Sequence, residues 1–233
     1  GVHADMSHLF ALLRLCHEQD VPRVFIHIFT DGRDSPPSAA LTYINELKTV
    51  IEREKTGQIA SVMGRYFAMD RDSRWDRTAK AYMCLTAGTG QKAGTIDEAV
   101  KTAYSRNQTD EFVEPTNIVD AMGKSIGLIK NNDAVIFYNF RIDRPRQLAK
   151  AFTLPDFENT ANNSDFDPYA VKYNKTHLSD ATKNTPFARG PALSNLYFAT
   201  MTQYARNIPS QIAFPPMTVD LSLGEEVASN GLK

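Results

Sequence analysis

The sequence is poor in cysteine, has no long apolar run, and carries charges that nearly cancel. Its 233 residues include only two cysteines, and its formal net charge is −1. Because Cys16 and Cys84 lie far apart in apolar, helix-like segments, they predict buried free thiols in a reducing cytoplasm rather than a disulfide framework. No apolar run reaches about 18 residues and no signal-peptide pattern is present, so the sequence predicts neither membrane insertion nor secretion.

Sequence motifs for several common chemistries are also missing. The chain has no Walker motif, no GxGxxG, no GxSxG elbow, and no His or Cys cluster with metal-ligand spacing. We therefore expect no metal or other cofactor bound by this chain and no serine nucleophile beside a base. The balanced charge and the lack of aromatic stacking motifs also argue against nucleic-acid binding, which normally needs an excess of basic residues.

What the sequence does contain is a regular alternation of strand-like and helix-like segments. Helices are predicted after an N-cap at Asp5, after Pro36 and Pro37, and after an N-cap at Thr95. Apolar and β-branched runs predict strands at 23–29, 58–63, 111–119, 134–140, 195–204 and 210–216. This alternation predicts an α/β fold, a three-layer α/β/α sandwich around a largely parallel, mixed sheet. Residues 154–190 lose the pattern and predict a polar excursion, ordered in part by Phe157, Phe166, Tyr169 and Tyr173.

Arginines gather where three of the predicted strands end. The strands run into DGRD (Asp31 to Asp34), GRYFAMDRD (Gly64 to Asp72) and FRIDR (Phe140 to Arg144). Ligands of open α/β sheets bind at the carboxyl ends of parallel strands, so these loops are expected to share one patch. A planar guanidinium holds carboxylate or phosphate through paired hydrogen bonds, and a small ligand carrying both groups would suit the patch. The arginines expected there are Arg33, Arg65, Arg71, Arg141 and Arg144.

Other charged residues near these loops have more than one interpretation. Asp34 is expected to stay ionised among the guanidiniums and to accept a proton from a bound hydroxyl where geometry allows. Arg74 and Arg77 stand at helical spacing and are expected to be solvated or paired with nearby aspartates, Asp72 and Asp76. His27 falls inside a strand and is expected to be a packed core residue. His3 lies in the terminal GVH segment, where no predicted helix or strand requires a histidine, and composition leaves its role open.

Six segments together resemble one family in order and spacing: GVH, TDGRDSPP, MGRYFAMDRDSRWDR, YNFRIDRPRQL, MTQY and IAFPP. They closely resemble the cofactor-independent (2,3-bisphosphoglycerate-independent) phosphoglycerate mutases over nearly the whole chain. The resemblance implies an enzyme of two α/β domains. One is alkaline-phosphatase-like, with a serine nucleophile and two Mn²⁺ or Mg²⁺ ions, and the other is an inserted phosphotransferase domain. Residues 1–233 would be the inserted domain alone, a monomeric fragment that is inactive without the absent domain.

The same resemblance assigns roles to individual residues. The whole enzyme would be an isomerase that interconverts 3-phosphoglycerate and 2-phosphoglycerate in glycolysis and gluconeogenesis through a phosphoserine. His3 would contact the substrate, and Arg33 and Asp34 would hold the glycerate, with Asp34 also the catalytic base or acid. The carboxylate and phosphoryl oxygens would be bound by Arg65, Arg71, Arg141 and Arg144. An alternative from another class is a freestanding module that binds a phosphorylated metabolite, with the fold kept and catalysis lost.

Overall fold

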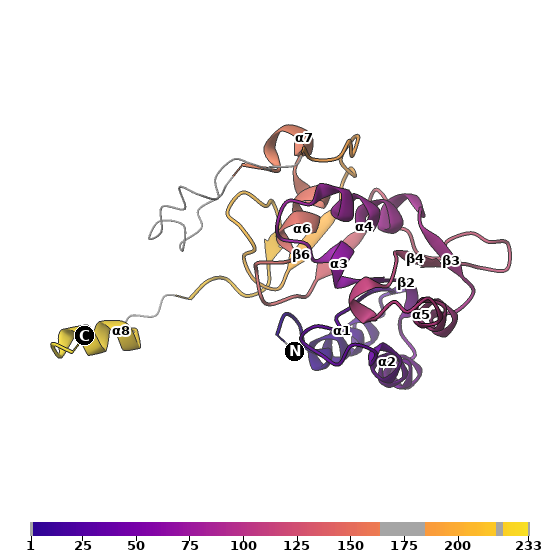
Figure 1. Ribbon diagram of the computed structural model, residues 1–233, viewed down its shortest axis with the longest axis horizontal. Coiled ribbons are helices and arrows are strands. Elements are labelled where there is room, and N and C mark those ends of the chain that lie inside the picture. Colours follow the sequence, from indigo (N-terminus) through magenta and orange to yellow (C-terminus); the bar gives the residue numbers. More distant parts are fainter. Residues whose placement is uncertain (1, 164–184, 218–220, 233) are drawn as a thin grey trace.

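The computed structural model describes residues 2–163, 185–217 and 221–232, and places helices on both faces of a central layer of strands (Figure 1). The first half of the chain forms α1 (Met6–Glu18), β1 (Phe25–Thr30), α2 (Ala40–Glu54), β2 (Gln58–Gly64), α3 (Arg65–Ala68), α4 (Trp75–Ala87), β3 (Gln91–Ala93) and α5 (Ile96–Ser105). The rest forms the 3₁₀ turn η1 (Asp110–Phe112), β4 (Thr116–Ile118), β5 (Ala134–Phe137), α6 (Arg146–Thr153), α7 (Phe157–Thr160), β6 (Tyr197–Thr200), β7 (Gln211–Ile212) and α8 (Leu223–Ser229). The predicted alternation of strands and helices is confirmed.

The described strands form two hydrogen-bonded sheets. The larger has the order β1-β2-β4-β3, in which only the β2–β4 pair is antiparallel, and β5-β6-β7 are parallel throughout. The predicted α/β fold with largely parallel, mixed strands is therefore confirmed, although the sequence did not separate the two sheets. Because Thr30 at the end of β1 pairs with Gly64 at the end of β2, the loops that follow these strands leave the sheet side by side.

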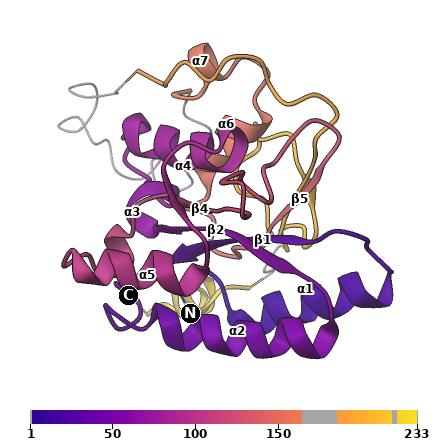
Figure 2. The same cartoon turned by 90° about the vertical axis from the view of Figure 1, so that its right-hand side faces the viewer.

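A hydrophobic core fills the space on each side of the strands. One core packs α1, α2 and α5 against β1 and β2, with Leu13, Leu47 and Val62 at its centre. The other joins α4 and α6 to β5 and β6 around Trp75 and Tyr204. Figure 2 shows α1 and α2 beneath the strands, with α4 and α6 above them. These are the three layers that the sequence predicted.

Local capping rules explain where several helices begin. The Asp5 carboxylate accepts the N–H of Ser7 at 2.9 Å at the start of α1, and the Thr95 hydroxyl accepts the N–H of Glu98 at 3.2 Å at the start of α5. Both predicted N-caps are confirmed. By contrast, α2 begins only at Ala40, after the two prolines, and the loop expected after β2 contains the single turn α3. One turn is too short to give a helical period, so the sequence did not show it.

The polar excursion is anchored at both of its described ends. Residues 164–184, with Phe166, Tyr169 and Tyr173, lie outside the described residues, whereas Phe157 is buried in the core shared with α6. On the returning segment, the Arg189 guanidinium donates to the carbonyl oxygens of Ala151, Leu154 and Pro155 at 2.6 to 3.0 Å. It thereby satisfies one carbonyl in the last turn of α6 and the two carbonyls that directly follow the helix.

The fold bears on two expectations drawn from composition, that the cysteines are free and that the chain does not enter a membrane. Both cysteines are free; Cys84 is buried, as predicted, and Cys16 is half-buried. None of the helices in the described ranges combines the length and apolar character that a bilayer crossing requires. The described part of α8 contributes no buried residue and lies apart from the layers in Figure 1.

A histidine inside the sheet makes the stability of the fold sensitive to acid. The Nδ1 atom of His27 on β1 lies 2.8 Å from the hydroxyl oxygen of the fully buried Ser61 on β2. Burial lowers the pKa of His27 to about 4. Below about pH 6.5, the ordinary pKa of histidine, His27 is protonated in the unfolded chain but stays neutral in the folded chain until the pH reaches about 4. The free energy of unfolding therefore falls as the pH drops through this range.

We therefore expect His27 to lower the free energy of unfolding by roughly 2 kcal/mol between pH 6.5 and pH 4.5. Urea unfolding across this range should show a shallower loss for His27→Gln than for the natural chain. Ser61→Ala keeps the imidazole and should retain the steep loss. Parallel pH profiles for His27→Gln and the natural chain would contradict this assignment.

Candidate functional site

Arg65 stands at the centre of a charged cluster at the ends of β1 and β2. It is the first residue of α3, its side chain is 2% exposed, and its Nη1 donates to Asp31 at 2.5 Å and to Asp34 at 2.6 Å. Both aspartates come from the loop after β1, which the parallel pairing of β1 and β2 brings alongside. The predicted meeting of these two loops is thus present in the structure.

The hydrogen bond from Arg65 lowers the pKa of Asp34 and keeps its carboxylate ionised at neutral pH. Partial burial raises the pKa of Asp31, but hydrogen bonds from the Asp34 N–H and from Arg65 outweigh burial and lower it overall. Burial in turn lowers the pKa of Arg65, while the two carboxylates raise it further than burial lowers it. At neutral pH the ionised carboxylates of Asp31 and Asp34 therefore both face the buried, charged guanidinium of Arg65.

His3 connects this cluster to the loop after β5. Its side chain is 6% exposed, with Nε2 3.3 Å from both Arg65 Nη2 and Asp34 Oδ2. Its backbone carbonyl accepts the N–H groups of Phe140 at 3.0 Å and Arg141 at 3.4 Å. Burial, followed by the charge of Arg65, lowers the pKa of His3, so the imidazole is neutral at pH 7. The terminal GVH segment is thus built into the site, which no local pattern could reveal.

Asp143 joins two arginines from loops that are far apart in the chain. Its carboxylate accepts Arg71 Nη1 at 2.6 Å and Arg141 Nε at 3.0 Å, and one of its oxygens lies 3.6 Å from His3 Nδ1. Arg71 and Arg141 are 46% and 47% exposed, so each guanidinium retains solvent-facing donors. Sequence reasoning missed Asp143, although its place between two arginines in FRIDR was a possible signal.

Arg144 is packed among other cations of the cluster. Its Nη1 donates to the backbone oxygen of Met69 at 3.0 Å, and its buried Nε has no hydrogen-bond partner among the residues that the structure describes. Burial and then the charges of Arg65 and Arg71 lower the pKa of Arg144. The buried Nε of Arg65 likewise has no acceptor in the described ranges 2–163, 185–217 and 221–232. Crowded guanidiniums with unused donors favour an anionic ligand.

Arg33 lies at the margin of this cluster. Its side chain is 62% exposed, and its Nη1 lies 3.5 Å from Glu111 of η1. The structure therefore brings His3, Asp34, Arg65, Arg71, Arg141 and Arg144 together, with Arg33 beside them. Among the described residues, no group of three or more His, Cys, Asp or Glu side chains is placed to hold a metal ion.

Comparison with known proteins identifies the family. The family model "BPG-independent PGAM N-terminus" matches residues 1–206. The chain belongs to this family.

Named relatives agree with this membership. The chain is 42% identical to the 2,3-bisphosphoglycerate-independent phosphoglycerate mutase of Chloroflexus aggregans and 40% identical to that of Moorella thermoacetica. All of this chain aligns, but only 42% and 40% of the two relatives. The chain thus spans about two fifths of their length. A crystal structure of Leishmania mexicana phosphoglycerate mutase matches 99% of this chain and 39% of its own with a TM-score of 0.76 and 24% identity, which shows a shared fold.

A buried carboxylate, that of Asp70, supports the loop that carries Arg71. Asp70 accepts the N–H groups of Asp72 at 3.1 Å and Arg74 at 2.9 Å, and Nε2 of the buried Gln147 at 3.0 Å. Arg74 pairs with Asp72, as predicted, and also with Asp70. Arg77 pairs with Asp70 rather than with Asp76, and it stacks on Tyr66 with its guanidinium carbon 3.7 Å from the ring centroid.

A tyrosine from the MTQY segment holds the end of β5. The hydroxyl of Tyr204 lies 2.7 Å from the carbonyl oxygens of both Phe137 and Asn139. Tyr204 is 1% exposed, and its carbonyl accepts Arg146 Nε at 2.7 Å. These contacts fix the backbone that leads into Arg141 and Arg144. The motif thus has a structural explanation, which its sequence position alone did not supply.

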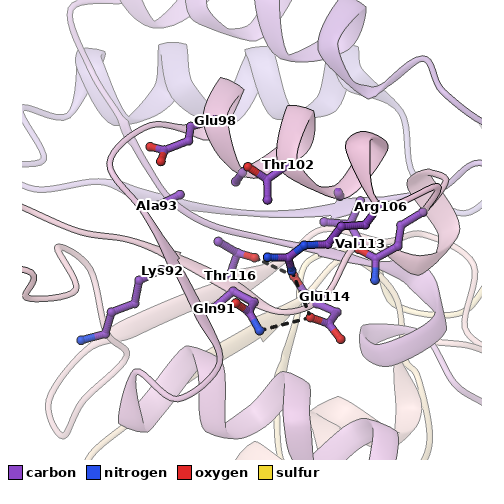
Figure 3. A pocket seen from close by; sticks show the side chains of 12 residues that line it. Gln91, Lys92, Ala93, Glu98, Thr102, Arg106, Val113, Glu114 and Thr116 are labelled. Atoms are coloured by element: carbon purple, nitrogen blue, oxygen red, sulfur yellow. Dashed lines mark hydrogen bonds and ion pairs between the residues drawn. The ribbon is translucent and has the colours of Figure 1, made fainter.

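A surface depression lies between α5 and the edge strand β3, apart from the arginine cluster (Figure 3). Its charged groups largely satisfy one another: Arg106 lies 4.0 Å from Glu114, and Gln91 donates to the same carboxylate at 3.2 Å. The depression therefore has no excess of positive or negative charge that would select an ion. The arginine cluster, where several guanidiniums lie together, is the candidate site.

Proposed function

We propose that this chain holds phosphoglycerate within a phosphoglycerate mutase that interconverts the 3-phospho and 2-phospho isomers. The observation that carries the proposal is the cluster of Arg65, Arg71, Arg141 and Arg144 around His3 and Asp34, with buried guanidinium N–H donors left unused. Phosphoglycerate presents a carboxylate and a phosphate, and both match the planar fork of arginine. The names of the relatives support this choice of substrate.

The arrangement suits retention and orientation of the substrate. Phosphoryl transfer depends mainly on positioning and charge neutralisation, which fixed guanidiniums provide. The half-exposed Arg71 and Arg141 can turn their free donors to the ligand, while Arg65 keeps Asp34 in place. An ionised Asp34 would accept a hydrogen bond from a glycerate hydroxyl and take up its proton during transfer. Neutral His3 would offer a donor or an acceptor to the same hydroxyls.

The phosphoserine chemistry would belong to the remaining length of the longer polypeptide. By the same proposal that part supplies the serine and two Mn²⁺ or Mg²⁺ ions, and the enzyme serves glycolysis and gluconeogenesis in the cytoplasm as a monomer. The role of this chain is to keep glycerate bound while the phosphoryl group is exchanged.

Titration with 3-phosphoglycerate tests the proposal directly. In ¹⁵N NMR spectra of the chain, we expect shifts concentrated at His3, residues 33–34, residues 65–71 and residues 141–144. Arg106→Ala, in the depression beside β3, should leave these shifts unchanged. Shifts that map to that depression instead would overturn the proposal. So would the absence of any shift in both this chain and the full-length polypeptide that contains it.

A further inference from the structure

The loop that carries Arg33 and Asp34 enters a helix that lacks a cap of its own. Residues 31–39 are mostly exposed or half-buried, and the N-cap residue of α2 is Ala39, whose side chain has no oxygen to accept the first helical N–H groups. Uncapped N–H groups at a helix start need another acceptor. The precision with which this loop places Asp34 therefore depends on a group from elsewhere in the chain.

Asp110 of η1 supplies that acceptor from 70 residues away. One carboxylate oxygen accepts the N–H groups of Ala39 and Ala40, both at 2.9 Å, and the other accepts the hydroxyl of Tyr104 at 2.5 Å. The residue is 1% exposed. Burial raises the pKa of Asp110 overall, although the hydrogen bonds from Tyr104, Ala39 and Ala40 act to lower it. A buried carboxylate at the start of a 15-residue helix is also favoured by the helix dipole.

The backbone of Asp110 holds both ends of the same loop. Its carbonyl oxygen accepts the hydroxyl of Thr30, the last residue of β1, at 2.6 Å. Its N–H donates to the carbonyl oxygen of Pro37 at 2.8 Å, close to where α2 begins. One residue thus fixes the loop where it leaves the sheet and where it enters the helix.

Two glycines allow this close approach. A Cβ on Gly32 would lie 2.8 Å from the Glu111 nitrogen and 2.9 Å from the Asp110 Cβ, and a Cβ on Gly64 would lie 2.1 Å from the Glu111 oxygen. Gly32 also has a φ of +67°, which L side chains rarely adopt. The N–H of Gly64 donates to the carbonyl oxygen of Val113 at 2.7 Å. The segment 110–113 therefore packs across the ends of both strands that deliver Asp34 and Arg65.

We propose that Asp110 is a positioning residue for the phosphoglycerate site, which holds residues 30–40 so that Asp34 meets Arg65 and His3. This inference rests on the proposed function for its ligand, but the placement of Asp34 can be measured without any ligand. Asp110 lies under this loop and is hydrogen-bonded to the loop backbone. It does not touch the substrate itself, and it acts through the residues whose positions it fixes.

The test compares Asp110→Ala with Asp97→Ala in the same chain. Asp97 also belongs to the α5 side of the fold and pairs with Lys48 of α2, but it lies away from the loop. In Asp110→Ala, ¹³C NMR titration should show the pKa of Asp34 rising toward its ordinary value, because the contact with Arg65 is lost. The dissociation constant for 3-phosphoglycerate should rise about tenfold. Asp97→Ala should lower the melting temperature without changing either quantity.

A conservative variant separates positioning from simple loss of stability. Asp110→Asn keeps a carbonyl oxygen for the N–H groups of Ala39 and Ala40 and should restore most of the Asp34 pKa shift and of the binding. If Asp110→Ala does not fold, Thr30→Val cuts the bond to the Asp110 carbonyl and should move the pKa of Asp34 in the same direction by less. The inference is overturned if the folded variant leaves the pKa of Asp34 as in the natural chain. Failure of the natural chain and its full-length parent to bind 3-phosphoglycerate would refute the proposed function and leave this pKa comparison decisive.

Discussion

Replacing Arg65 with methionine should strongly weaken the binding of phosphoglycerate and destabilise the folded chain. Arg65 is 2% exposed and bonds to the carboxylates of Asp31 and Asp34. Without the guanidinium, two carboxylates face each other with no cation between them. Breaking such a pair by removing one partner costs about 3 kcal/mol or more of unfolding free energy. We expect the dissociation constant for 3-phosphoglycerate to rise about 100-fold.

Urea unfolding and NMR titration measure these two effects separately. The pKa of Asp34 should also rise in Arg65→Met, because the hydrogen bond that lowers it is gone. Arg14→Met is the matched control: Arg14 is 70% exposed, pairs with Glu18 on α1, and should change stability by less than about 1 kcal/mol. Wild-type affinity in Arg65→Met would show that the cluster does not hold the substrate.

Replacing Asp70 with alanine should produce the second largest effect, through the loop that carries Arg71. The Asp70 carboxylate is 3% exposed and accepts hydrogen bonds from the backbone of Asp72 and Arg74 and from buried Gln147. Its removal takes the acceptor from the half-buried N–H groups of Asp72 and Arg74 and leaves Nε2 of Gln147 with Thr78 alone, and each lost acceptor costs about 1–3 kcal/mol. We expect a loss of roughly 3 kcal/mol in the free energy of unfolding, with larger amide shift changes in residues 69–74 than elsewhere.

The neighbouring carboxylate provides a control of the same chemistry. Asp72 is 57% exposed and pairs with Arg74, so Asp72→Ala should cost less than about 1 kcal/mol in urea unfolding. Equal losses for the two variants would mean that burial of Asp70 does not decide the stability of the loop. The contrast therefore tests the network and not merely the removal of a negative charge from an arginine-rich segment.

Interactions between near neighbours in the chain explain which parts of the fold were predictable. Asp5 and Thr95 cap helices by bonding to N–H groups two and three residues ahead, so their effect is visible in a short window of sequence. Apolar periodicity likewise located most strands and helices, although the strand predicted at 111–119 is confined to Thr116–Ile118 and follows the 3₁₀ turn η1. The short strand β3 and the single turn α3 were missed, because three or four residues are too few to establish a period.

The candidate site was likewise predictable in some parts and not in others. Arginines at the ends of strands could be expected to converge, since parallel neighbouring strands end at one edge, and the structure brings Arg65, Arg71, Arg141 and Arg144 together around His3. Their roles toward a substrate stay predictions. Arg33 is turned toward Glu111 at the margin, and Asp143 joins Arg71 to Arg141. The contacts of Arg33 with Glu111 and of Arg71 with Asp143 join residues more than 70 positions apart, so the local sequence could not give these partners.

Residue order alone was enough to predict the α/β class, the strand ends that carry arginine and the resemblance to one family. The burial of His3, and the capping of α2 by Asp110 from 70 residues away, became visible only in the folded chain. So did the arrangement of the strands in two sheets. The physical reason is that a buried polar group must find its hydrogen-bond partner in space. Which partner lies within about 3 Å is set by the packing of whole layers, and not by distance along the chain.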